Sequence, residues 1–455
     1  MNAATTITTD VVIIGAGLSG LTAARRLTER GISVIVVEAK TRVGGRVHRK
    51  ELSPGKFLDI GGRFVGPGQD DILRIAAEVG VETAPFFHDG RCVWNFDGQR
   101  WETDGDGPLR DSASREQYDA ARAELERLAF TLPTGSPWAA PNAATLDRTA
   151  FSTWLDEHLA DTAARWALLF DLNSFFFVPA HRLSLLHVLS ILASTGGWEI
   201  LDQSDDRRIV GGSVEIAHRL AAALPGRVHT GQPVRTVEWT TDSVTVRTDE
   251  LSITARRCIV AMNPSDARSI SFEPALPWAR GLFHRQHQVQ GGVMGILIYQ
   301  RPFWRDAGYS GQVTTDLPAG TYVRDGSLPD GSLGALNSFM TPLSEGPWGA
   351  PIGLLDSPAA RREAITRVVE MAFGPDARTA IDYVEQDWLN EPFTAGVQAA
   401  LPPGLMTEVG AAAVEPLGSI HWSSTELGDR WTGWMNGAIA SAERVAIEVA
   451  STLNI

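Results

Sequence analysis

Three glycines and one carboxylate near the N-terminus have the types and spacing of a phosphate-binding turn. Gly15, Gly17 and Gly20 follow a run of four β-branched residues, and Glu38 ends a second apolar run about 20 residues further on. Glycine permits the tight turn after the first strand and a close approach of the backbone to a pyrophosphate, whose charge suits the free N–H groups of the following helix. Glu38 is placed to accept hydrogen bonds from ribose hydroxyls. The pattern predicts a dinucleotide-binding site, in which we include Ser19.

A basic loop directly after the second apolar run indicates which dinucleotide is bound. Residues 42–46 read R-V-G-G-R, which resembles the second signature of FAD-binding oxidases. In those proteins the glycines let the backbone pass the flavin, and an arginine approaches the pyrophosphate. Residues 57–69, FLDIGGRFVGPGQ, resemble the D-x-G-x-x-W/Y-x-G-P segment of flavin amine oxidases. The two resemblances imply FAD as the cofactor and assign to its site Arg42, Gly45, Arg46, Gly62 and Arg63.

The C-terminal region carries the most specific part of the resemblance. Residues 420–426 and 431–438 read IHWSSTE and WTGWMNGA, and they are similar to the A-G-T-E … G-x-x-x-G-A block of the flavin monoamine oxidase family. With the earlier segments, the chain resembles that family over nearly its full length. The resemblance implies contacts to the ribityl-pyrophosphate, to the flavin rings and, through one residue's backbone, to the adenine. The residues concerned are Val234, Trp388, Thr425, Glu426, Trp434 and Met435.

Three positions depart from the family pattern, and each changes the expected chemistry. Val397 stands where covalent members carry a cysteine, which implies that FAD is held non-covalently. Gln398 replaces a tyrosine of the aromatic cage over the flavin, whose other wall falls on Trp434. Met294 stands where the family usually has a lysine that is tied to the reaction of reduced flavin with oxygen, and methionine can neither donate a hydrogen bond nor carry charge. The electron acceptor is therefore left open between oxygen and another molecule.

Tyr322 and Arg324 are the residues most suited to recognising a substrate. They lie two positions apart on a predicted strand, so their side chains point to the same face, and the resemblance places that strand beside the substrate cavity. A buried arginine can bind a carboxylate through two parallel hydrogen bonds. The alternative is a surface arginine paired with Asp325 or Asp330. Arg63 is a lesser candidate for the carboxylate-binding role.

Other acidic and aromatic side chains leave alternatives open. Asp205 could hold a second ammonium group, as in a diamine oxidase, or it could be a solvated loop acid. At least one of the side chains of Phe175, Phe176, Phe177 and Trp198 is expected to line the substrate cavity. No histidine is assigned as a general base.

The overall composition argues against several classes of partner. The net charge of −14 disfavours nucleic acid and anionic membrane surfaces. Cys92 and Cys258 are the only cysteines and lack a metal-type spacing, so neither a metal site nor a disulfide framework is expected. The N-terminus does not resemble a signal peptide, and no apolar run is long enough to span a membrane. We expect a soluble, cytoplasmic protein that acts on a small molecule; the oligomeric state stays open, with a homodimer as one candidate.

The framework that positions these residues is predicted to bring distant segments together. Val11–Ile14 and Ile32–Val37 read as buried parallel strands joined by a helix over 18–29, whereas residues 112–201 are rich in helix patterns. We expect an α/β fold with a Rossmann-type, GR2-like FAD-binding domain and an interleaved mixed α+β substrate domain. The expected boundaries are 1–87, 205–285 and 386–455 for the FAD-binding domain, and 88–204 and 286–385 for the substrate domain.

Two enzymatic functions fit the sequence. In the first, a small amine or amino acid gives a hydride to flavin N5 and becomes an imine, while the protein supplies orientation and a dry slot. In the second, a desaturase forms a carbon–carbon double bond next to the carbonyl of a small cyclic keto acid, with the carboxylate held by Arg324 and the carbonyl polarised by Tyr322 or Gln398. The family resemblance favours the first, and the departures at the cage and lysine positions favour the second. The tryptophans retained beside the flavin disfavour a non-enzymatic flavoprotein.

Overall fold

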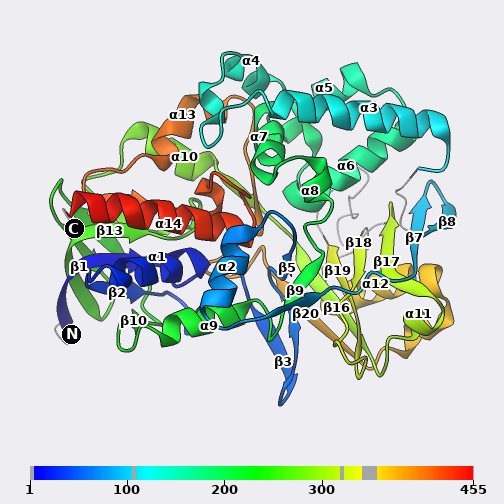
Figure 1. Ribbon diagram of the computed structural model, residues 1–455, viewed down its shortest axis with the longest axis horizontal. Coiled ribbons are helices and arrows are strands. Elements are labelled where there is room, and N and C mark those ends of the chain that lie inside the picture. Colours follow the sequence, from blue (N-terminus) through cyan, green and yellow to red (C-terminus); the bar gives the residue numbers. More distant parts are fainter. Residues whose placement is uncertain (1–4, 105–108, 318–321, 341–355, 454–455) are drawn as a thin grey trace.

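Strand β1 (Thr5–Ile14) lies at the centre of an eight-stranded mixed sheet. The computed structural model describes residues 5–104, 109–317, 322–340 and 356–453 (Figure 1). Strand β1 pairs in parallel with β2 (Val34–Val37) on one side and with β13 (Leu251–Val260) on the other. Side chains of Val11–Ile14 alternate between two separate apolar cores. Because both faces of the strand are buried, its sequence is continuously apolar.

The remaining strands of this sheet come from widely separated parts of the chain. The order is β10-β2-β1-β13-β12-β11-β14, and a further strand, β22, pairs with β13. The predicted hairpin is confirmed, because β11 and β12 pair antiparallel around the turn at Thr241 and Asp242. The bounds are β10 (Val228–His229), β11 (Thr236–Trp239), β12 (Val244–Arg247), β14 (Ser271–Glu273) and β22 (Ile420–Trp422).

A seven-stranded sheet forms the second layer, in the order β20-β16-β19-β18-β17-β7-β8. Its central strand β16 pairs antiparallel with both β19 and β20, and helix α12 (Pro358–Phe373) packs against it. The bounds are β7 (Arg91–Phe96), β8 (Gln99–Thr103), β16 (Val293–Tyr299), β17 (Tyr309–Thr315), β18 (Tyr322–Asp325), β19 (Gly334–Met340) and β20 (Asp382–Asp387).

Helices form a third layer at the top of the view in Figure 1, above the seven-stranded sheet. The longest of them, α3 (Ser112–Ala129), begins where the carboxylate of Asp111 accepts a hydrogen bond from the Ser114 N–H at 2.8 Å. The others are α4 (Ala143–Arg148), α5 (Phe151–His158), α6 (Thr162–Phe176), α7 (Leu185–Thr195) and α8 (Trp198–Leu201), with α10 (Trp278–Gln286) and α13 (Leu405–Val414) beside the eight-stranded sheet.

Short strands and helices complete the described chain. Strands β5 (Phe64–Val65), β9 (Arg207–Ile209) and β6 (Thr83–Pro85) form a three-stranded sheet, while β3 (Arg49–Ser53) pairs with β4 (Lys56–Asp59) and β15 (Gln288–Gln290) pairs with β21 (Gln398–Ala400). Helix α9 (Val214–Ala222) packs on α1, and α11 (Phe303–Asp306) packs on β17. None of the described helices combines the length and the apolar composition needed to cross a membrane.

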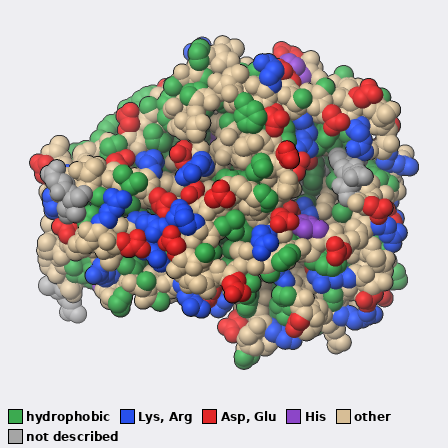
Figure 2. Space-filling view, viewed as in Figure 1, with side chains coloured by type: hydrophobic (Ala, Val, Ile, Leu, Met, Phe, Trp, Pro, Cys, Tyr) green, Lys and Arg blue, Asp and Glu red, His purple; other side chains and the backbone are tan. Residues whose placement is uncertain are grey.

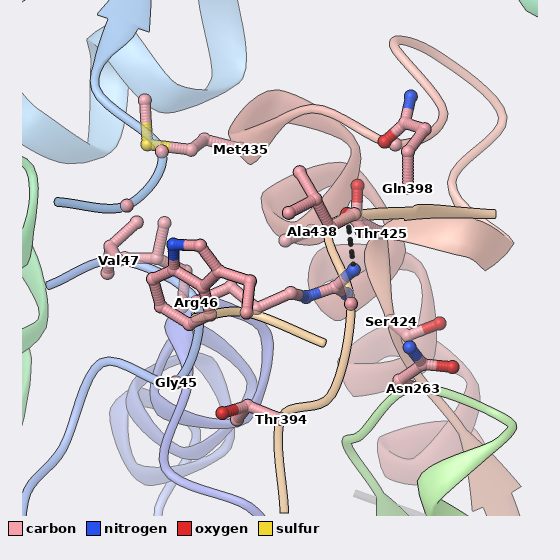
Figure 3. Close-up of a pocket in the computed structure, with 18 of the residues that line it drawn as sticks. Gly45, Arg46, Val47, Asn263, Thr394, Gln398, Ser424, Thr425, Met435 and Ala438 are labelled. Atoms are coloured by element: carbon pink, nitrogen blue, oxygen red, sulfur yellow. Dashed lines mark hydrogen bonds between the residues drawn. The ribbon is translucent and has the colours of Figure 1, made fainter. Parts of the chain in front are cut away.

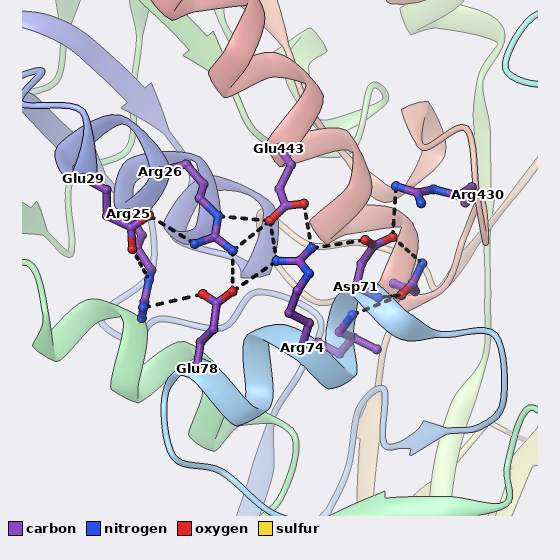
Figure 4. Close-up of polar contacts among 10 residues, drawn as sticks. Arg25, Arg26, Glu29, Asp71, Arg74, Glu78, Arg430 and Glu443 are labelled. Atoms are coloured by element: carbon purple, nitrogen blue, oxygen red, sulfur yellow. Dashed lines mark hydrogen bonds and ion pairs between the residues drawn. The ribbon is translucent and has the colours of Figure 1, made fainter.

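Helices α1 (Leu18–Glu29), α2 (Asp70–Glu78) and α14 (Met435–Thr452) pack together on the eight-stranded sheet. Their outer face carries a network of ion pairs in which Arg26 contacts both Glu78 and Glu443, and Arg74 contacts Glu443 (Figure 4). Figure 2 shows acidic and basic side chains interleaved over this face of the molecule. The network joins the first helix of the chain to the last described helix.

Helix α2 has its N-terminus capped by a distant residue. The side chain of Gln69, which precedes the helix, makes no capping hydrogen bond. Instead, the Asn436 side-chain oxygen accepts hydrogen bonds from the N–H groups of Asp71 and Ile72 at 2.9 and 3.0 Å. Its amide nitrogen donates to the Asp71 carboxylate at 3.1 Å. The start of α2 therefore depends on the start of α14, 365 residues away.

The predicted strand–helix–strand unit is confirmed, with changed strand ends. The helix spans residues 18–29 as predicted, and the second strand begins at Val34 rather than Ile32. The first strand begins six residues before Val11, because the polar residues from Thr5 onward continue the parallel ladder with β13. Backbone hydrogen bonds, rather than side-chain hydrophobicity, extend this end of the strand.

Candidate functional site

One cavity of about 550 Å³ brings together residues from both large sheets and from the helical layer. Nearly all the residues singled out from the sequence line it. Those assigned to the cofactor are Gly15, Gly17, Ser19, Glu38, Gly45, Arg46, Gly62, Arg63, Val234, Trp388, Thr425, Trp434 and Met435. Those expected near the reacting atoms are Met294, Tyr322, Arg324 and Gln398. The predicted residues Gly20, Arg42 and Glu426 do not line the cavity but support the residues that do.

The glycine turn after β1 is required by the close approach of neighbouring backbone. Gly15 has φ +107°, and a Cβ placed there would lie 2.4 Å from the carbonyl oxygen of Ala261. A Cβ on Gly20 would lie 2.0 Å from the carbonyl oxygen of Gly15. Gly17 precedes helix α1 and provides no side-chain cap, so N–H groups of the first helical turn remain available at the cavity. This arrangement suits a phosphate group.

Glu38 is held rigidly at the end of β2. Its two carboxylate oxygens accept hydrogen bonds from the N–H groups of Ala16 at 2.7 Å and Lys40 at 2.9 Å. Burial raises the pKa of Glu38, although these two bonds oppose the rise. Each oxygen keeps a second lone pair for a hydroxyl group. The geometry fits the predicted contact with a ribose.

A buried ion pair ties the glycine loop to the C-terminal segment. Arg46 donates to the Glu426 carboxylate at 2.6 Å and to the Val397 carbonyl oxygen at 3.0 Å. Figure 3 shows Arg46 reaching across the pocket from the loop at Gly45 toward Thr425. Burial alone would raise the pKa of Glu426, but the Arg46 guanidinium holds it below its usual range. Both groups are therefore charged at neutral pH.

Several buried polar atoms at this end of the cavity have no partner within the described chain. They are Arg42 Nη2, Thr394 Oγ1 and Ser424 Oγ, and the last two residues line the cavity. Helix α14 also begins here, at Met435, without a side-chain cap. Buried polar groups normally have partners, so this donor and acceptor set fits the phosphates and ring edges of FAD. Neither Cys92 nor Cys258 lines the cavity, which leaves no cysteine for a covalent bond to the flavin.

The tryptophans and Gln398 form the wall beside the expected flavin position. Trp388 is fixed because its ring N–H donates to the Ile60 carbonyl oxygen at 2.8 Å. Trp434 packs edge-on against Trp431, with ring centroids 5.5 Å apart. Gln398 lies so close to Gly433 that a Cβ on the glycine would be 2.2 Å from the amide nitrogen. The wall is thus half aromatic and half amide, as the sequence predicted.

Arg324 has a different partner from either of those expected. It forms an ion pair with Asp205 at 3.0 Å, and it also donates to Gln312 and to the Tyr322 hydroxyl. Burial disfavours the charged form, but Asp205 holds the pKa of Arg324 above its usual range. Asp325 instead accepts hydrogen bonds from Trp304 and Arg305.

The expectations for Arg324 and Asp205 therefore need correction. The predicted pairing of Arg324 with Asp325 or Asp330 is wrong. Asp205 is neither a solvated loop acid nor an unengaged carboxylate for a second ammonium, because it neutralises Arg324 inside the cavity. The partner lies in the loop after α8, which spacing along the chain cannot reveal.

The aromatic cluster divides between the cavity and the core. Phe177 and Trp198 line the cavity, as expected for at least one of the four, whereas Phe176 is fully buried in the apolar core. The side chain of Phe175 lies outside the described residues.

Sequence reasoning missed other lining residues, among them Phe170, Asp171, Asn337, Ser338 and Phe339. A signal existed for two of them, because Asn337 and Ser338 are polar residues in the middle of the otherwise apolar strand β19. Buried polar side chains in a central strand are uncommon and indicate a site. No metal-binding cluster occurs among the residues that the structure describes.

Comparisons with known proteins agree with this geometry. Residues 18–450 match the family model described as flavin containing amine oxidoreductase. AofH of Mycobacterium tuberculosis is 35% identical over 453 residues, which cover 98% of this chain and 97% of AofH. An L-amino acid dehydrogenase of Synechocystis is 33% identical, with 98% and 95% covered. The structure of a putrescine oxidase bound to putrescine superposes with a TM-score of 0.93 at 31% identity, covering 98% of this chain and 100% of the other.

Proposed function

This chain belongs to the flavin-containing amine oxidoreductase family, and from that premise we propose that it oxidises a small amine or amino acid to an imine. FAD is its cofactor, held non-covalently. The observation that carries the proposal is the single cavity, which is lined at one end by the glycine turn and at the other by Trp388, Trp434 and Gln398. The comparisons do not support the desaturase alternative.

The residues around the reacting atoms are proposed to orient the amine and exclude water. When bound, FAD supplies the acceptor for the hydride that leaves the carbon next to nitrogen. Trp434 and Gln398 would hold the nitrogen in a mostly apolar slot, where desolvation favours its neutral form. Phe170, Phe177 and Trp198 would close the slot to solvent, which keeps the geometry productive.

We also propose the division of the chain into two functional parts. Every strand of the eight-stranded sheet falls within 1–87, 205–285 and 386–455, the segments proposed to bind FAD. The seven-stranded sheet falls within 88–204 and 286–385, except for the last two residues of β20. The second set would hold the substrate.

The electron acceptor is proposed to be either oxygen or an organic acceptor. Met294 is buried on β16 and lines the cavity, where it places no positive charge. The Synechocystis relative is named a dehydrogenase, which fits a chain that passes electrons to a molecule other than oxygen.

Anaerobic mixing of the purified flavoprotein with amines and amino acids tests the proposed function. We expect loss of the oxidised flavin absorbance with at least one compound that has a hydrogen on the carbon next to nitrogen. The matching imine, or the carbonyl compound from its hydrolysis, should form in equal amount. If no amine or amino acid reduces the flavin while other reductants do, the proposal is wrong.

A further inference from the structure

Arg63 is the cavity-lining cation that the protein leaves without a partner. It lies between β4 and β5, and its guanidinium sits over the Phe64 ring at 4.5 Å from the centroid. It forms no hydrogen bond and no ion pair with any described residue. A buried or half-buried guanidinium without a partner is costly, so such a group usually has a ligand. Burial lowers the pKa of Arg63 to about 10, so the group remains charged at neutral pH.

The acidic groups that influence Arg63 are engaged elsewhere. Asp205 is paired with Arg324. Asp59 accepts a hydrogen bond from the Ser213 N–H at 3.2 Å and does not line the cavity. Neither carboxylate lies within ion-pair distance of Arg63, so its charge is directed at the cavity.

The other acids of this cavity also have partners. Asp171 accepts a hydrogen bond from the Tyr118 hydroxyl at 2.5 Å, and Asp202 is paired with Arg122 at 2.5 Å. An ammonium group at the far end of a diamine would thus meet carboxylates that are already satisfied. An anionic group would meet a cation that is not. The charge pattern favours a substrate that carries an anion.

Tyr322 provides a second donor for that anion. Its hydroxyl oxygen accepts from Arg324 Nε, so its own hydrogen is free to donate toward the cavity that the ring lines. Burial raises the pKa of Tyr322 to about 12, which keeps the hydrogen in place. A guanidinium and a hydroxyl together match a carboxylate, which accepts several hydrogen bonds.

We propose that Arg63 and Tyr322 form an anion subsite that binds the carboxylate of an amino-acid substrate. The role that the sequence gave to Arg324 passes to Arg63, because Arg324 is neutralised by Asp205. Arg324 then acts as a positioning residue that orients the Tyr322 hydroxyl. The proposal rests on the proposed amine oxidation and narrows its substrate class.

Matched substrate pairs and three variants test the subsite. Each pair is an amino acid and the amine that remains after decarboxylation, for example phenylalanine with phenethylamine and 4-aminobutyrate with propylamine. We expect the wild-type kcat/KM to be higher for the acid of at least one pair. Arg63→Gln should lower kcat/KM for that acid on the order of 100-fold and for its amine less than about threefold. Arg63→Lys should fall between, because lysine keeps the charge but loses the fork.

Arg207→Gln is the control variant. Arg207 lies on β9, which pairs with β5, but its side chain bonds to Thr83 and does not line the cavity. It should behave as wild type with both members of a pair. Equal loss of both members in Arg63→Gln, or a wild type that prefers the amine in every pair, would overturn the subsite.

Binding of benzoate separates this proposal from the proposed function. Benzoate carries the carboxylate but has no amine, so its binding, followed by the change in the flavin spectrum, requires no turnover. We expect its Kd to rise on the order of 100-fold in Arg63→Gln. If benzoate binding is indifferent to Arg63 while amines reduce the flavin, the subsite fails and the function stands. If benzoate binds through Arg63 but no amine reduces the flavin, the function fails and the subsite stands.

Discussion

Replacing Glu426 with glutamine should destabilise the protein by removing one charge of a buried ion pair. The Glu426 side chain is 2% exposed, and that of Arg46 is 24% exposed. Glutamine keeps the size and one acceptor, yet it leaves the guanidinium without its counter-charge. Breaking a buried pair from one side costs about 3–5 kcal/mol. Because Asp266 also acts on Arg46 and part of the guanidinium faces the cavity, we expect about 2–4 kcal/mol here.

Urea unfolding of the FAD-saturated protein would measure this loss, with the FAD Kd determined separately for each variant because bound ligand adds stability. The cycle is completed by Arg46→Gln and by the double variant, which removes both charges. We expect the double variant to be more stable than the sum of the single losses predicts, by about 2 kcal/mol or more. A Glu426→Gln protein within about 0.5 kcal/mol of wild type, or a coupling below that value, would refute the reasoning.

The pH dependence provides an independent check on the same pair. Arg46 holds the pKa of Glu426 below the ordinary value of 4.5. A carboxyl group with a lowered folded-state pKa stabilises the protein fully above its unfolded pKa and loses this contribution as pH falls through the folded value. The stability difference between wild type and Glu426→Gln should therefore be constant near neutral pH and shrink below about pH 4.5.

Three further substitutions have distinct expected outcomes. Gly20→Ala should yield protein with little bound flavin, measured as the ratio of flavin to protein absorbance, because the new Cβ would lie 2.0 Å from the Gly15 carbonyl oxygen; normal flavin content would contradict the predicted clash. Burial raises the pKa of Asp59 to about 6 from 3.8, so the charged form opposes folding above that pH. Asp59→Asn, which keeps the acceptor for the Ser213 N–H, should gain Tm relative to wild type from about pH 5 to about pH 8, and a pH-independent difference would count against the assignment. Met294→Lys should speed reoxidation of the reduced flavin by air at least about tenfold in stopped-flow experiments, since a nearby cation stabilises the charge that develops on oxygen; an unchanged rate would show that the acceptor reacts elsewhere.

The parts of the site that depend on local sequence could be predicted. The glycine turn, helix α1 and Glu38 lie within one strand–helix–strand unit, in which spacing dictates geometry. The alternation of residues 322 and 324 likewise placed both side chains on one face of β18. These features follow from the backbone conformation of a few neighbouring residues.

Pairings between distant segments could not be predicted from the sequence. The ion pair of Arg324 with Asp205 joins a strand of one sheet to a loop after the helical layer. Any of several acids would have satisfied the arginine equally well on paper. The same limit applies to Arg63, since a side chain without a partner is recognised only when all its neighbours are placed.

The capping of α2 by Asn436 has a consequence for the order of events during synthesis. The glycine turn and α2 leave the ribosome long before Asn436, and the Ser19 hydroxyl must wait for Ser423, 404 residues later, to make its 2.5 Å contact. The nascent chain can build β1 and α1 early, but the pocket for the dinucleotide stays incomplete until α14 docks. FAD should therefore be captured only after translation has passed α14, so that cofactor loading reports a finished chain rather than assisting an unfinished one.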